Sequence, residues 1–224
     1  MTNSFRLGPD GIYRCDGFQQ FIWQKHGFGT RDANPEADIV LKQIHSAIVR
    51  NVNGWHGQFR EREGDALITD EPRKSIGIRT ADCVPILLLD SKRRVIAAVH
   101  AGWRGAAEQI VRCAIEAMSR DFGTAAGDVY AAMGPCIRAC CYEVGAEVAE
   151  RFSAWFPEWK LEDEMTRKLN LAEANRRQMQ AAGVNPEHIF DSELCTTCQS
   201  GQFFSFRREP ENPGRMVASI TRLS

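Results

Sequence analysis

The sequence predicts an α/β fold of the α+β type, a single-domain sandwich in which helices pack on a mixed, largely antiparallel sheet. Apolar runs such as 84–89 and 95–99 have the length of buried strands and are far too short to span a membrane. Short polar turns join neighbouring runs, which favours antiparallel pairs. Segments with helical periodicity occur between the strands. The 224 residues contain no repeat or linker, so we predict one catalytic domain over residues 1–224.

The predicted strands in the first half of the chain come from β-branched and apolar segments. Residues 38–52 are rich in β-branched side chains and predict one or two strands around His45. Residues 64–69, with the sequence GDALIT, predict a short strand that begins after a glycine. Residues 74–102 predict three strands, and the polar turn DSKRR at 90–94 reverses the second into the third.

The second half of the chain alternates helical and extended segments. Residues 105–122 predict one helix that ends at Gly123, because the following apolar side chains recur at helical spacing: Ile110, Val111, Ala114, Ile115 and Met118. Similar patterns predict further helices in 145–156 and 169–183. They predict strands in 202–209, in 215–223 and in 128–133, where the strand ends before the Gly134–Pro135 break.

Composition and charge disfavour several classes of function. The chain carries 28 Lys and Arg against 29 Asp and Glu, so its formal net charge of −1 favours neither nucleic acid nor a membrane surface as a partner. The N-terminal residues MTNSFRLGPDG lack the apolar core of a secretory signal. Eight cysteines without an export signal indicate a reducing compartment, where thiols stay free, bind metal or act in catalysis. We therefore expect a cytoplasmic protein.

Two histidines and one cysteine stand out as candidates for chemistry, although they are far apart in the sequence. His45, Cys83 and His100 lie where predicted strands end or next to glycine and proline, so their side chains can line a cleft. Two imidazoles and a thiolate bind zinc and leave the fourth tetrahedral position open for water or substrate. Zinc bound there would lower the pKa of a bound water toward neutrality and polarise a substrate oxygen. The three residues are thus candidate metal ligands and candidate catalytic groups.

The residue types alone leave other interpretations of this set open. Both histidines can be satisfied sheet residues and Cys83 a packed thiol, and the spacing by itself favours this simpler interpretation. A second alternative is a metal-free dyad, with Cys83 as nucleophile, His100 as its base and Asp82 or another carboxylate to orient the ring. A third is copper, which also uses two histidines and a cysteine. Multicopper oxidase chemistry is disfavoured, because the chain has five histidines and no His-x-His pair.

Four further residues are candidates for substrate contacts. Arg104 and Gly105, in HAGWRG, begin a predicted helix whose free N–H groups, together with the Arg104 guanidinium, favour an anion such as phosphate. Asp65 either caps a turn or orients a metal-binding histidine. Arg207 lies on a predicted strand, on the face opposite two phenylalanines, where it either enters a pocket or faces solvent.

A second group of cysteines is a candidate for a structural metal or a redox function. Cys195 and Cys198 form one CxxC pair. A structural zinc site needs a second pair, and CIRACC offers Cys136, Cys140 and Cys141. A lone CxxC pair in a cytosolic chain is more often redox-sensitive or without function than it is a metal-binding site. The sequence does not show whether Cys136, Cys195 and Cys198 meet in space.

The motifs of this chain occur in the order seen in the laccase-domain, or polyphenol oxidase, family, which the chain resembles from about residue 35 to its end. They are QIHS, GDALIT, TADCVPILLLD, AVHAGWRG, GPCI, CYEVG, LNLAEANRRQM and CT…FFSFRRE…GR. TADC and HAGWRG are the most specific of them. Members of the family are also described as multifunctional purine nucleoside phosphorylases and, in some bacteria, as a peptidoglycan editing factor.

The resemblance implies a zinc enzyme that acts on purine nucleosides. It implies that His45, Cys83 and His100 form a zinc-binding active site, with Cu²⁺ as the alternative metal, in a fold similar to the toxin-like Cys-hydrolase fold. The implied reactions are phosphorolysis of adenosine, inosine and 5′-methylthioadenosine to the base and a ribose 1-phosphate, and deamination of adenosine. We place the phosphate at Arg104 and the amides around Gly105. The expected partners are purine nucleosides and phosphate, in a monomer or a homodimer.

Three other functions stay open at this point. The peptidoglycan editing name favours a Cys–His amidohydrolase that acts on a UDP-muramyl-amino acid precursor. A copper polyphenol oxidase is disfavoured by the histidine count. A non-catalytic domain that binds metal or ligand is the third. Zinc deaminases use a nearby glutamate as proton shuttle, and the sequence does not identify one here.

Overall fold

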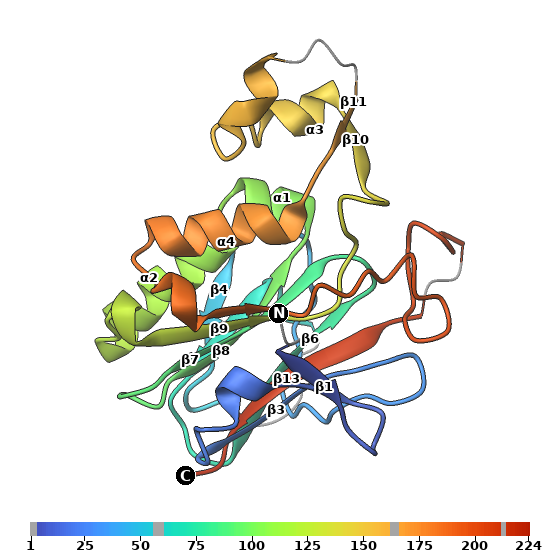
Figure 1. The fold of residues 1–224 in the computed structure, drawn as a ribbon. Helices are drawn as coiled ribbons and strands as arrows, with labels where there is room; N and C mark the ends of the chain where they lie inside the picture. Colours follow the sequence, from blue (N-terminus) through green and yellow to red (C-terminus); the bar gives the residue numbers. More distant parts are fainter. Residues whose placement is uncertain (1–3, 56–60, 162–165, 212–213) are drawn as a thin grey trace.

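A six-stranded sheet lies at the centre of the fold, with helices on one face and a second sheet on the other (Figure 1). The computed structural model describes residues 4–55, 61–161, 166–211 and 214–224. The strands of the central sheet are β4 (Val49–Asn51), β5 (Ala66–Thr69), β7 (Val84–Asp90), β8 (Ile96–Ala101), β9 (Val129–Met133) and β12 (Ile189–Asp191). Their order is β12-β9-β7-β8-β5-β4. Strands β4 and β5 pair in parallel, as do β12 and β9, and the other neighbours are antiparallel.

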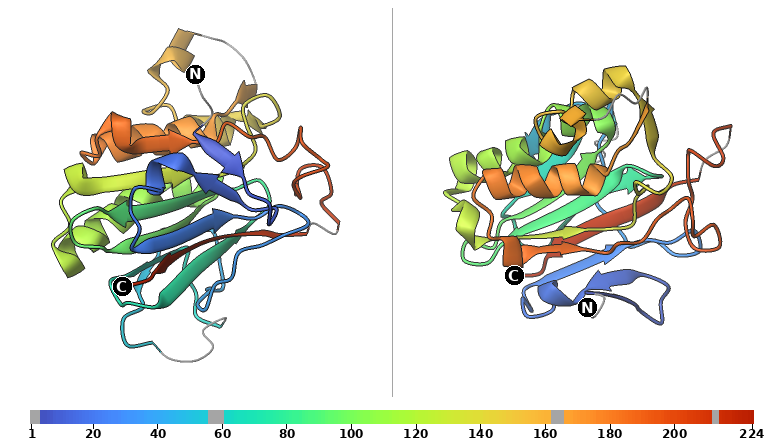
Figure 2. Two further views of the ribbon diagram at one scale, coloured as in Figure 1. Left: turned by 60° about the horizontal axis from the view of Figure 1, so that its bottom comes forward. Right: turned by 45° about the horizontal axis from the view of Figure 1, so that its top comes forward.

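The second sheet covers the face of the central sheet that the helices leave uncovered (Figure 2). Its strands are β1 (Phe5–Leu7), β2 (Tyr13–Cys15), β3 (Gln24–Phe28), β6 (Lys74–Thr80) and β13 (Met216–Arg222). They lie in the order β1-β2-β3-β13-β6, and all neighbours are antiparallel. Strand β13 therefore lies between β3 and β6, and it pairs with β6 along its whole length, from Met216 opposite Thr80 to Arg222 opposite Lys74.

Strand β7 shows why the apolar runs of the sequence form buried strands. Ile86 and Leu88 belong to the core under the helices, whereas Leu87 and Leu89 belong to the core between the two sheets. Successive side chains of a strand point to opposite faces, so a strand between two cores is apolar at every position. Burying each such side chain contributes roughly 1.5–3 kcal/mol. The predicted fold class, a sandwich with a mixed, largely antiparallel sheet and packed helices, is confirmed.

The helical layer consists of α1 (Trp103–Ala107), α2 (Ile110–Phe122) and α4 (Leu171–Ala181). The apolar side chains within 110–118 that predict a helix are buried against the central sheet. The segment forms two helices rather than one, because Gln109 between them adopts a left-handed conformation with φ of 59°. Gly123, with φ of 72°, ends α2 as predicted, and the Asn170 side chain caps α4 by accepting a backbone amide hydrogen bond.

A small extension lies beyond the helical layer (Figure 1). It contains the two-stranded sheet of β10 (Glu143–Gly145) and β11 (Thr166–Lys168) together with α3 (Ala146–Glu150). The helix predicted over 145–156 therefore ends early, and the turns that follow it still bury Phe152 and Phe156. Short 3₁₀ helices are at Asp16–Phe18, Ala126–Asp128, Pro157–Leu161 and Pro186–His188.

The prediction of one or two strands within 38–52 holds for β4 at the end of the segment but is wrong at His45. Pairing within 38–52 is confined to β4 and isolated bridges, and His45 itself has a left-handed φ of 61°. The buried Asp65 carboxylate accepts hydrogen bonds from three successive backbone amides here, those of residues 44–46. These bonds hold the chain in a turn, which β propensity does not reveal.

The segment 202–209 is not a strand either. Ser205 is buried and Phe206 is exposed, which reverses the predicted alternation. The Asp82 carboxylate accepts hydrogen bonds from the Ser205 hydroxyl and from a nearby backbone amide, and the Arg208 guanidinium donates to three backbone carbonyls. The segment therefore folds into turns around these two charged side chains.

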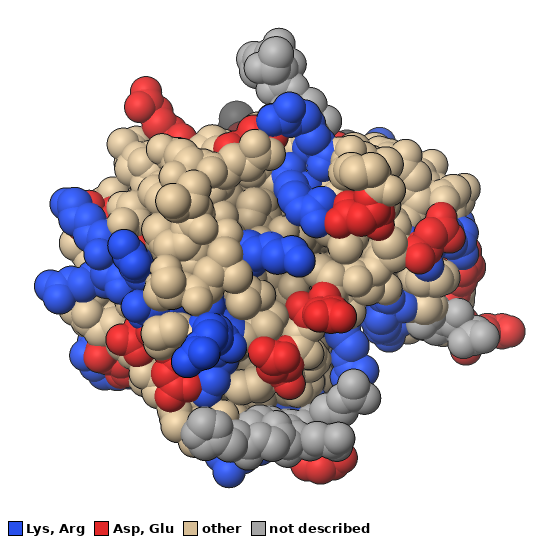
Figure 3. All heavy atoms as spheres, turned by 90° about the horizontal axis from the view of Figure 1, so that it is seen from below, with Lys and Arg blue, Asp and Glu red and all other residues tan. Residues whose placement is uncertain are grey.

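Basic and acidic side chains are interspersed on the face of the molecule shown in Figure 3. This mixture is what a formal net charge of −1 leads one to expect. Within the described residues, every helix is too short or too polar to cross a membrane.

Candidate active site and metal centre

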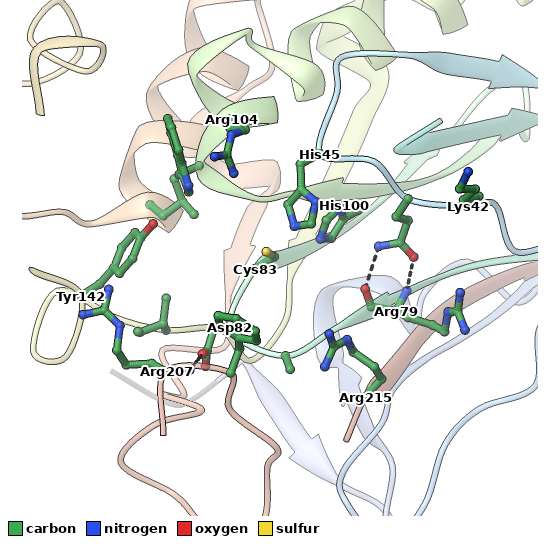
Figure 4. Close-up of a pocket in the computed structure, with 16 residues that line it drawn as sticks. Lys42, His45, Arg79, Asp82, Cys83, His100, Arg104, Tyr142, Arg207 and Arg215 are labelled. Atoms are coloured by element: carbon green, nitrogen blue, oxygen red, sulfur yellow. Dashed lines mark hydrogen bonds between the residues drawn. The ribbon is translucent and has the colours of Figure 1, made fainter. Parts of the chain in front are cut away.

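The three candidate ligands converge at one end of the central sheet (Figure 4). His45 lies in the irregular segment before β4, Cys83 immediately precedes β7, and His100 is near the end of β8. The antiparallel pairing of β7 and β8 places Val84 opposite Ala101, so Cys83 and His100 emerge close together. One ligand atom from each of the three residues lies within 4.8 Å of the others. The two imidazole rings meet edge to face, with their centroids 5.0 Å apart.

Asp65 is buried behind this set and holds two of its members in place. One carboxylate oxygen accepts hydrogen bonds from His100 Nδ1 (2.8 Å) and from the His45 amide (3.0 Å). The other accepts from the Ser46 amide and hydroxyl, each at 2.7 Å, and from the Ile44 amide at 3.2 Å. Burial by itself raises the pKa of Asp65, but the hydrogen bonds from His100 and Ser46 lower it to about 2.

The hydrogen bond to Asp65 fixes the orientation of the His100 ring. An ionised carboxylate only accepts hydrogen bonds, so Nδ1 carries the proton and Nε2 is left for a metal or a thiol. Asp65 is 0% exposed and does not line the cavity above the site. Its position therefore supports orientation of a candidate ligand rather than contact with substrate.

Proximity shifts the pKa values of Cys83 and His100 in opposite directions. Burial alone raises the pKa of Cys83, but the charge and hydrogen bonds of His100 and His45 lower it to about 6. Burial alone lowers the pKa of His100, but the Cys83 thiolate and the Asp65 carboxylate raise it to about 9. At neutral pH these groups form a thiolate beside an imidazolium. A deprotonated sulfur is what both metal binding and nucleophilic attack require.

Gly102 leaves room for this set, and a side chain there is expected to disrupt it. An added Cβ would lie 2.9 Å from His45 Cδ2 and 3.0 Å from Cys83 Sγ. We expect Gly102→Ala to weaken metal binding at the site at least about tenfold, measured by competition with a chromogenic chelator. Gly145 is a matched control, because it also precedes a five-residue helix with φ of −73° and ψ of 170°, and its Cβ position is open. If the two alanine variants bind metal equally well, close packing does not shape the site.

The donor set suits a catalytic zinc ion. Two imidazole nitrogens and a thiolate are three protein ligands, the number that catalytic zinc sites use. His100 also has the carboxylate partner that usually orients a zinc-binding histidine. A metal-free Cys–His dyad requires only one imidazole, as the base. The second imidazole, that of His45 beside Cys83, therefore favours a metal over the dyad. The convergence that the metal hypothesis requires is present.

A centre with several copper ions does not fit the histidines that the structure describes. His26 lies in the second sheet, where its Nε2 accepts a hydrogen bond from the Cys15 amide. His188 stacks on Tyr130, with ring centroids 3.8 Å apart. His56 lies outside the described residues. The described imidazoles at the candidate centre are therefore two, which suffices for a single ion only.

A cavity of about 810 Å³ opens over the candidate ligands (Figure 4). Five basic side chains line it: Lys42, Arg79, Arg104, Arg207 and Arg215. The acidic side chain among the described lining residues, Asp82, is already engaged by the hydroxyls of Thr196 and Ser205. The aromatic side chains of Trp103, Tyr142 and Phe206 line the cavity as well. Such a cavity attracts an anion and offers flat apolar surfaces to a ring.

Two of the four predicted substrate contacts line this cavity. The Arg104 guanidinium lies 4.4 Å from the ring centroid of Trp103, and that of Arg207 lies 5.3 Å from the centroid of Tyr142. Gly105 is buried and does not line the cavity. Helix α1 has only five residues, so it lacks the aligned peptide units that make a helix N-terminus an anion site. Of the predicted phosphate contacts at this turn, the Arg104 side chain is therefore the one that can bind an anion.

Several residues that line the cavity are not predicted from the sequence. Lys42, Arg79 and Arg215 come from three separate segments, and each is a single basic residue there. Gln43 ties its segment to β6 by exchanging hydrogen bonds of 2.7 and 2.8 Å with the Arg79 backbone (Figure 4). Tyr142 is the one with a sequence signal, because it lies in the motif CYEVG.

Comparisons with known proteins place the chain among relatives. A family model described as multi-copper polyphenol oxidoreductase laccase matches residues 27–223. A purine nucleoside phosphorylase of Clostridium acetobutylicum is 38% identical over 183 residues, which cover 81% of this chain and 75% of that protein. The adenosine deaminase RL5 of an unknown prokaryotic organism is 41% identical over 203 residues, or 83% of this chain and 75% of that protein. The crystal structure of YlmD from Geobacillus stearothermophilus has a TM-score of 0.87 at 28% identity, covering 99% of this chain and 100% of that one.

Proposed function

The chain belongs to the multi-copper polyphenol oxidoreductase laccase family, and we propose that it is a zinc-dependent purine nucleoside phosphorylase that also deaminates adenosine. The proposed substrates are adenosine, inosine and 5′-methylthioadenosine. The observation that carries the proposal is a three-ligand centre under a cavity lined by five basic side chains. The printed names of the relatives from Clostridium and of RL5 support the two reactions.

The proposed metal ligands are His45, Cys83 and His100. Bound zinc would supply a Lewis acid and lower the pKa of a coordinated water. The chain contributes the orientation of His100 by Asp65, the turn that carries His45, and a sulfur that ionises below neutral pH. Cu²⁺ is the alternative ion for the same donors.

The basic lining of the cavity supports phosphate as the second substrate. In phosphorolysis a hydrogen phosphate oxygen bonds to C1′ of the ribose while the bond from C1′ to the base nitrogen breaks. The proton of the hydrogen phosphate is transferred to the departing base. The overall reaction therefore balances without another proton donor. The Arg104 guanidinium can hold two phosphate oxygens at once. The rings of Trp103 and Tyr142 offer flat surfaces for the purine.

Replacing Arg104 tests the phosphate site. We expect Arg104→Ala to raise the KM for phosphate by at least about 10- to 100-fold, the range for one lost charge-assisted hydrogen bond, and to leave the KM for inosine nearly unchanged. Arg112→Ala is the control, since Arg112 is exposed on α2 and pairs with Glu116. An unchanged phosphate KM in Arg104→Ala removes Arg104 from the phosphate site.

The central experiment is an assay of the purified protein with inosine and phosphate. We expect hypoxanthine and ribose 1-phosphate in equal amounts, no reaction without phosphate, and loss of turnover after chelation that added Zn²⁺ restores. Hypoxanthine formation that ignores phosphate contradicts phosphorolysis. Turnover that survives complete metal removal contradicts the zinc proposal.

A Cys–His amidohydrolase is the second candidate function. The observation that favours it is the sequence of contacts from Asp65 to His100 to Cys83, in which a carboxylate orients a histidine beside an ionised thiol. The substrate class of this alternative is a UDP-muramyl-amino acid. Chelation separates the two, because the amidohydrolase keeps its activity without metal and loses it only on thiol alkylation, whereas the zinc enzyme loses activity on chelation.

The organisation of the chain supports one catalytic domain over residues 1–224. The two apolar cores lie on opposite faces of the same central sheet, so neither core is complete without it. All eight cysteines are free thiols, which is compatible with a cytoplasmic location.

A further inference from the structure

Four cysteines from two distant segments meet away from the proposed active site. Cys140 and Cys141 follow β9, and Cys195 and Cys198 follow β12. Their sulfur atoms all lie within 4.8 Å of one another. We propose that these four thiolates bind one structural Zn²⁺. Cys136, which the sequence also offers as a candidate, is buried outside this group.

The sulfur–sulfur distances match a tetrahedral ion. Zinc–sulfur bonds of about 2.3 Å in a tetrahedron require sulfur atoms about 3.8 Å apart. Cys140 lies 3.7 Å from Cys141, 3.7 Å from Cys195 and 3.6 Å from Cys198, sulfur to sulfur. Cys141 and Cys198 are 3.3 Å apart. A single ion fits this spacing, whereas a disulfide requires sulfurs about 2.0 Å apart.

The backbone brings the two segments together without any metal. A parallel bridge joins Cys136 and Cys195, and the Cys136 amide and carbonyl are hydrogen-bonded to Leu194 and Thr196. The Arg138 guanidinium forms a bidentate pair with Asp191 at the end of β12. The cysteines are therefore positioned by the fold, which lowers the entropic cost of closing a four-ligand site.

The surroundings of Cys195 suit a metal-bound thiolate. The Arg138 guanidinium lies beside this segment, since its Nε donates a hydrogen bond to the Leu194 carbonyl, and its positive charge favours a thiolate at Cys195. Zinc binding converts four thiols to four thiolates and releases four protons, so the site carries two net negative charges. The Arg138 guanidinium partly balances that charge.

The proposed site connects to the active site through its ligand-bearing segments. Ile137 and Tyr142, on either side of Cys140 and Cys141, line the active-site cavity. Thr196, in the CxxC turn, donates its hydroxyl hydrogen bond to Asp82, which precedes the proposed ligand Cys83. A metal bound by these four cysteines would link the two ligand-bearing segments. It would thereby restrict the motion of the cavity residues next to them. Its role is structural rather than catalytic.

Metal counting in four variants tests the proposal. Protein purified anaerobically with Zn²⁺ is expected to hold two ions per chain, as is Cys113→Ser, a control on α2. Cys198→Ser and Cys83→Ser are each expected to hold one, and the double variant none. If wild type holds one ion and Cys198→Ser none, the second site stands while the zinc proposal for the active site falls. Equal zinc in wild type and Cys198→Ser overturns the second site.

Cobalt substitution provides a readout that does not depend on how Cys198→Ser folds. Cys83→Ser loaded with one equivalent of Co²⁺ is expected to show sulfur-to-cobalt charge transfer and the visible bands of tetrahedral cobalt with four thiolates. Absence of the charge-transfer band overturns the proposal. So does mass spectrometry of freshly prepared anaerobic protein, if it finds these four cysteines joined as disulfides.

Discussion

Cys83→Ser is expected to lose the active-site metal and nucleoside turnover together. Replacing residues that merely orient metal ligands costs about 10- to 100-fold, so we expect removal of a ligand to lower kcat/KM for inosine by more than about 100-fold. The serine hydroxyl keeps the shape of the thiol but does not ionise at neutral pH, whereas the pKa of Cys83 is about 6. Phosphorolysis kinetics and metal analysis of the same preparation measure the two losses.

The control for this substitution is Cys113→Ser, because Cys113 is a half-buried thiol on α2 that neither lines the cavity nor belongs to a candidate ligand group. Its activity and metal content are expected to equal those of wild type. A Cys83→Ser protein that keeps its metal but loses turnover points to a nucleophile instead and favours the amidohydrolase. Retention of both properties rejects Cys83 as a functional residue.

Asp65→Ala is expected to destabilise the protein by about 3–5 kcal/mol, since it leaves a buried cation and several buried donors without their shared acceptor. The lost partners are the His100 ring and the backbone amides of residues 44–46. Urea denaturation of metal-free protein measures the change. Asp16→Ala is the control: Asp16 pairs with Arg6 at the surface, and its loss is expected to cost less than about 1 kcal/mol.

Asp65→Asn separates the positioning role from general stability. The amide keeps the shape of the carboxylate but adds a donor where the neighbouring groups are also donors, so the turn at His45 and the His100 tautomer are both expected to suffer. We expect metal affinity to fall about 10- to 100-fold even in the folded fraction. Unchanged metal affinity in folded Asp65→Asn assigns Asp65 to stability alone.

The sequence predicts which side chains could form the metal centre but does not predict that they meet. His45, Cys83 and His100 are chosen by residue type and by their place at strand ends. Their convergence depends on the register of β7 and β8 and on the turn at His45, both of which are tertiary properties. In the sequence, only the family resemblance indicates that these three residues meet.

The basic lining of the cavity is beyond sequence reasoning for a different reason. Lys42, Arg79 and Arg215 occur singly, and a single Lys or Arg is ordinarily expected to be exposed to solvent. They share a cavity because β6 and the start of β13 lie side by side and Gln43 is tied to β6. Arg104 and Arg207 are found in advance because they belong to motifs with glycine or aromatic neighbours.

Local pattern predicts most of the secondary structure, and a buried carboxylate is present at two of the segments where it fails. The strands of 74–102 and the helix within 169–183 form as their apolar periods predict. The segments around His45 and within 202–209, both predicted as strands, are those that Asp65 and Asp82 hold in turns. Both carboxylates stand next to proposed catalytic elements, so the local rules fail where the fold shapes its site.

The place of β13 has a consequence for how the protein is made. This strand joins β3 to β6, yet residues 216–222 leave the ribosome about 190 residues after β3 does. Until they emerge, both neighbours expose open edges and the apolar side chains beneath them lack a cover. Nascent chains that stall before residue 216 should therefore be substrates for chaperones and prone to aggregate, even though most of the cavity's residues have already been synthesised.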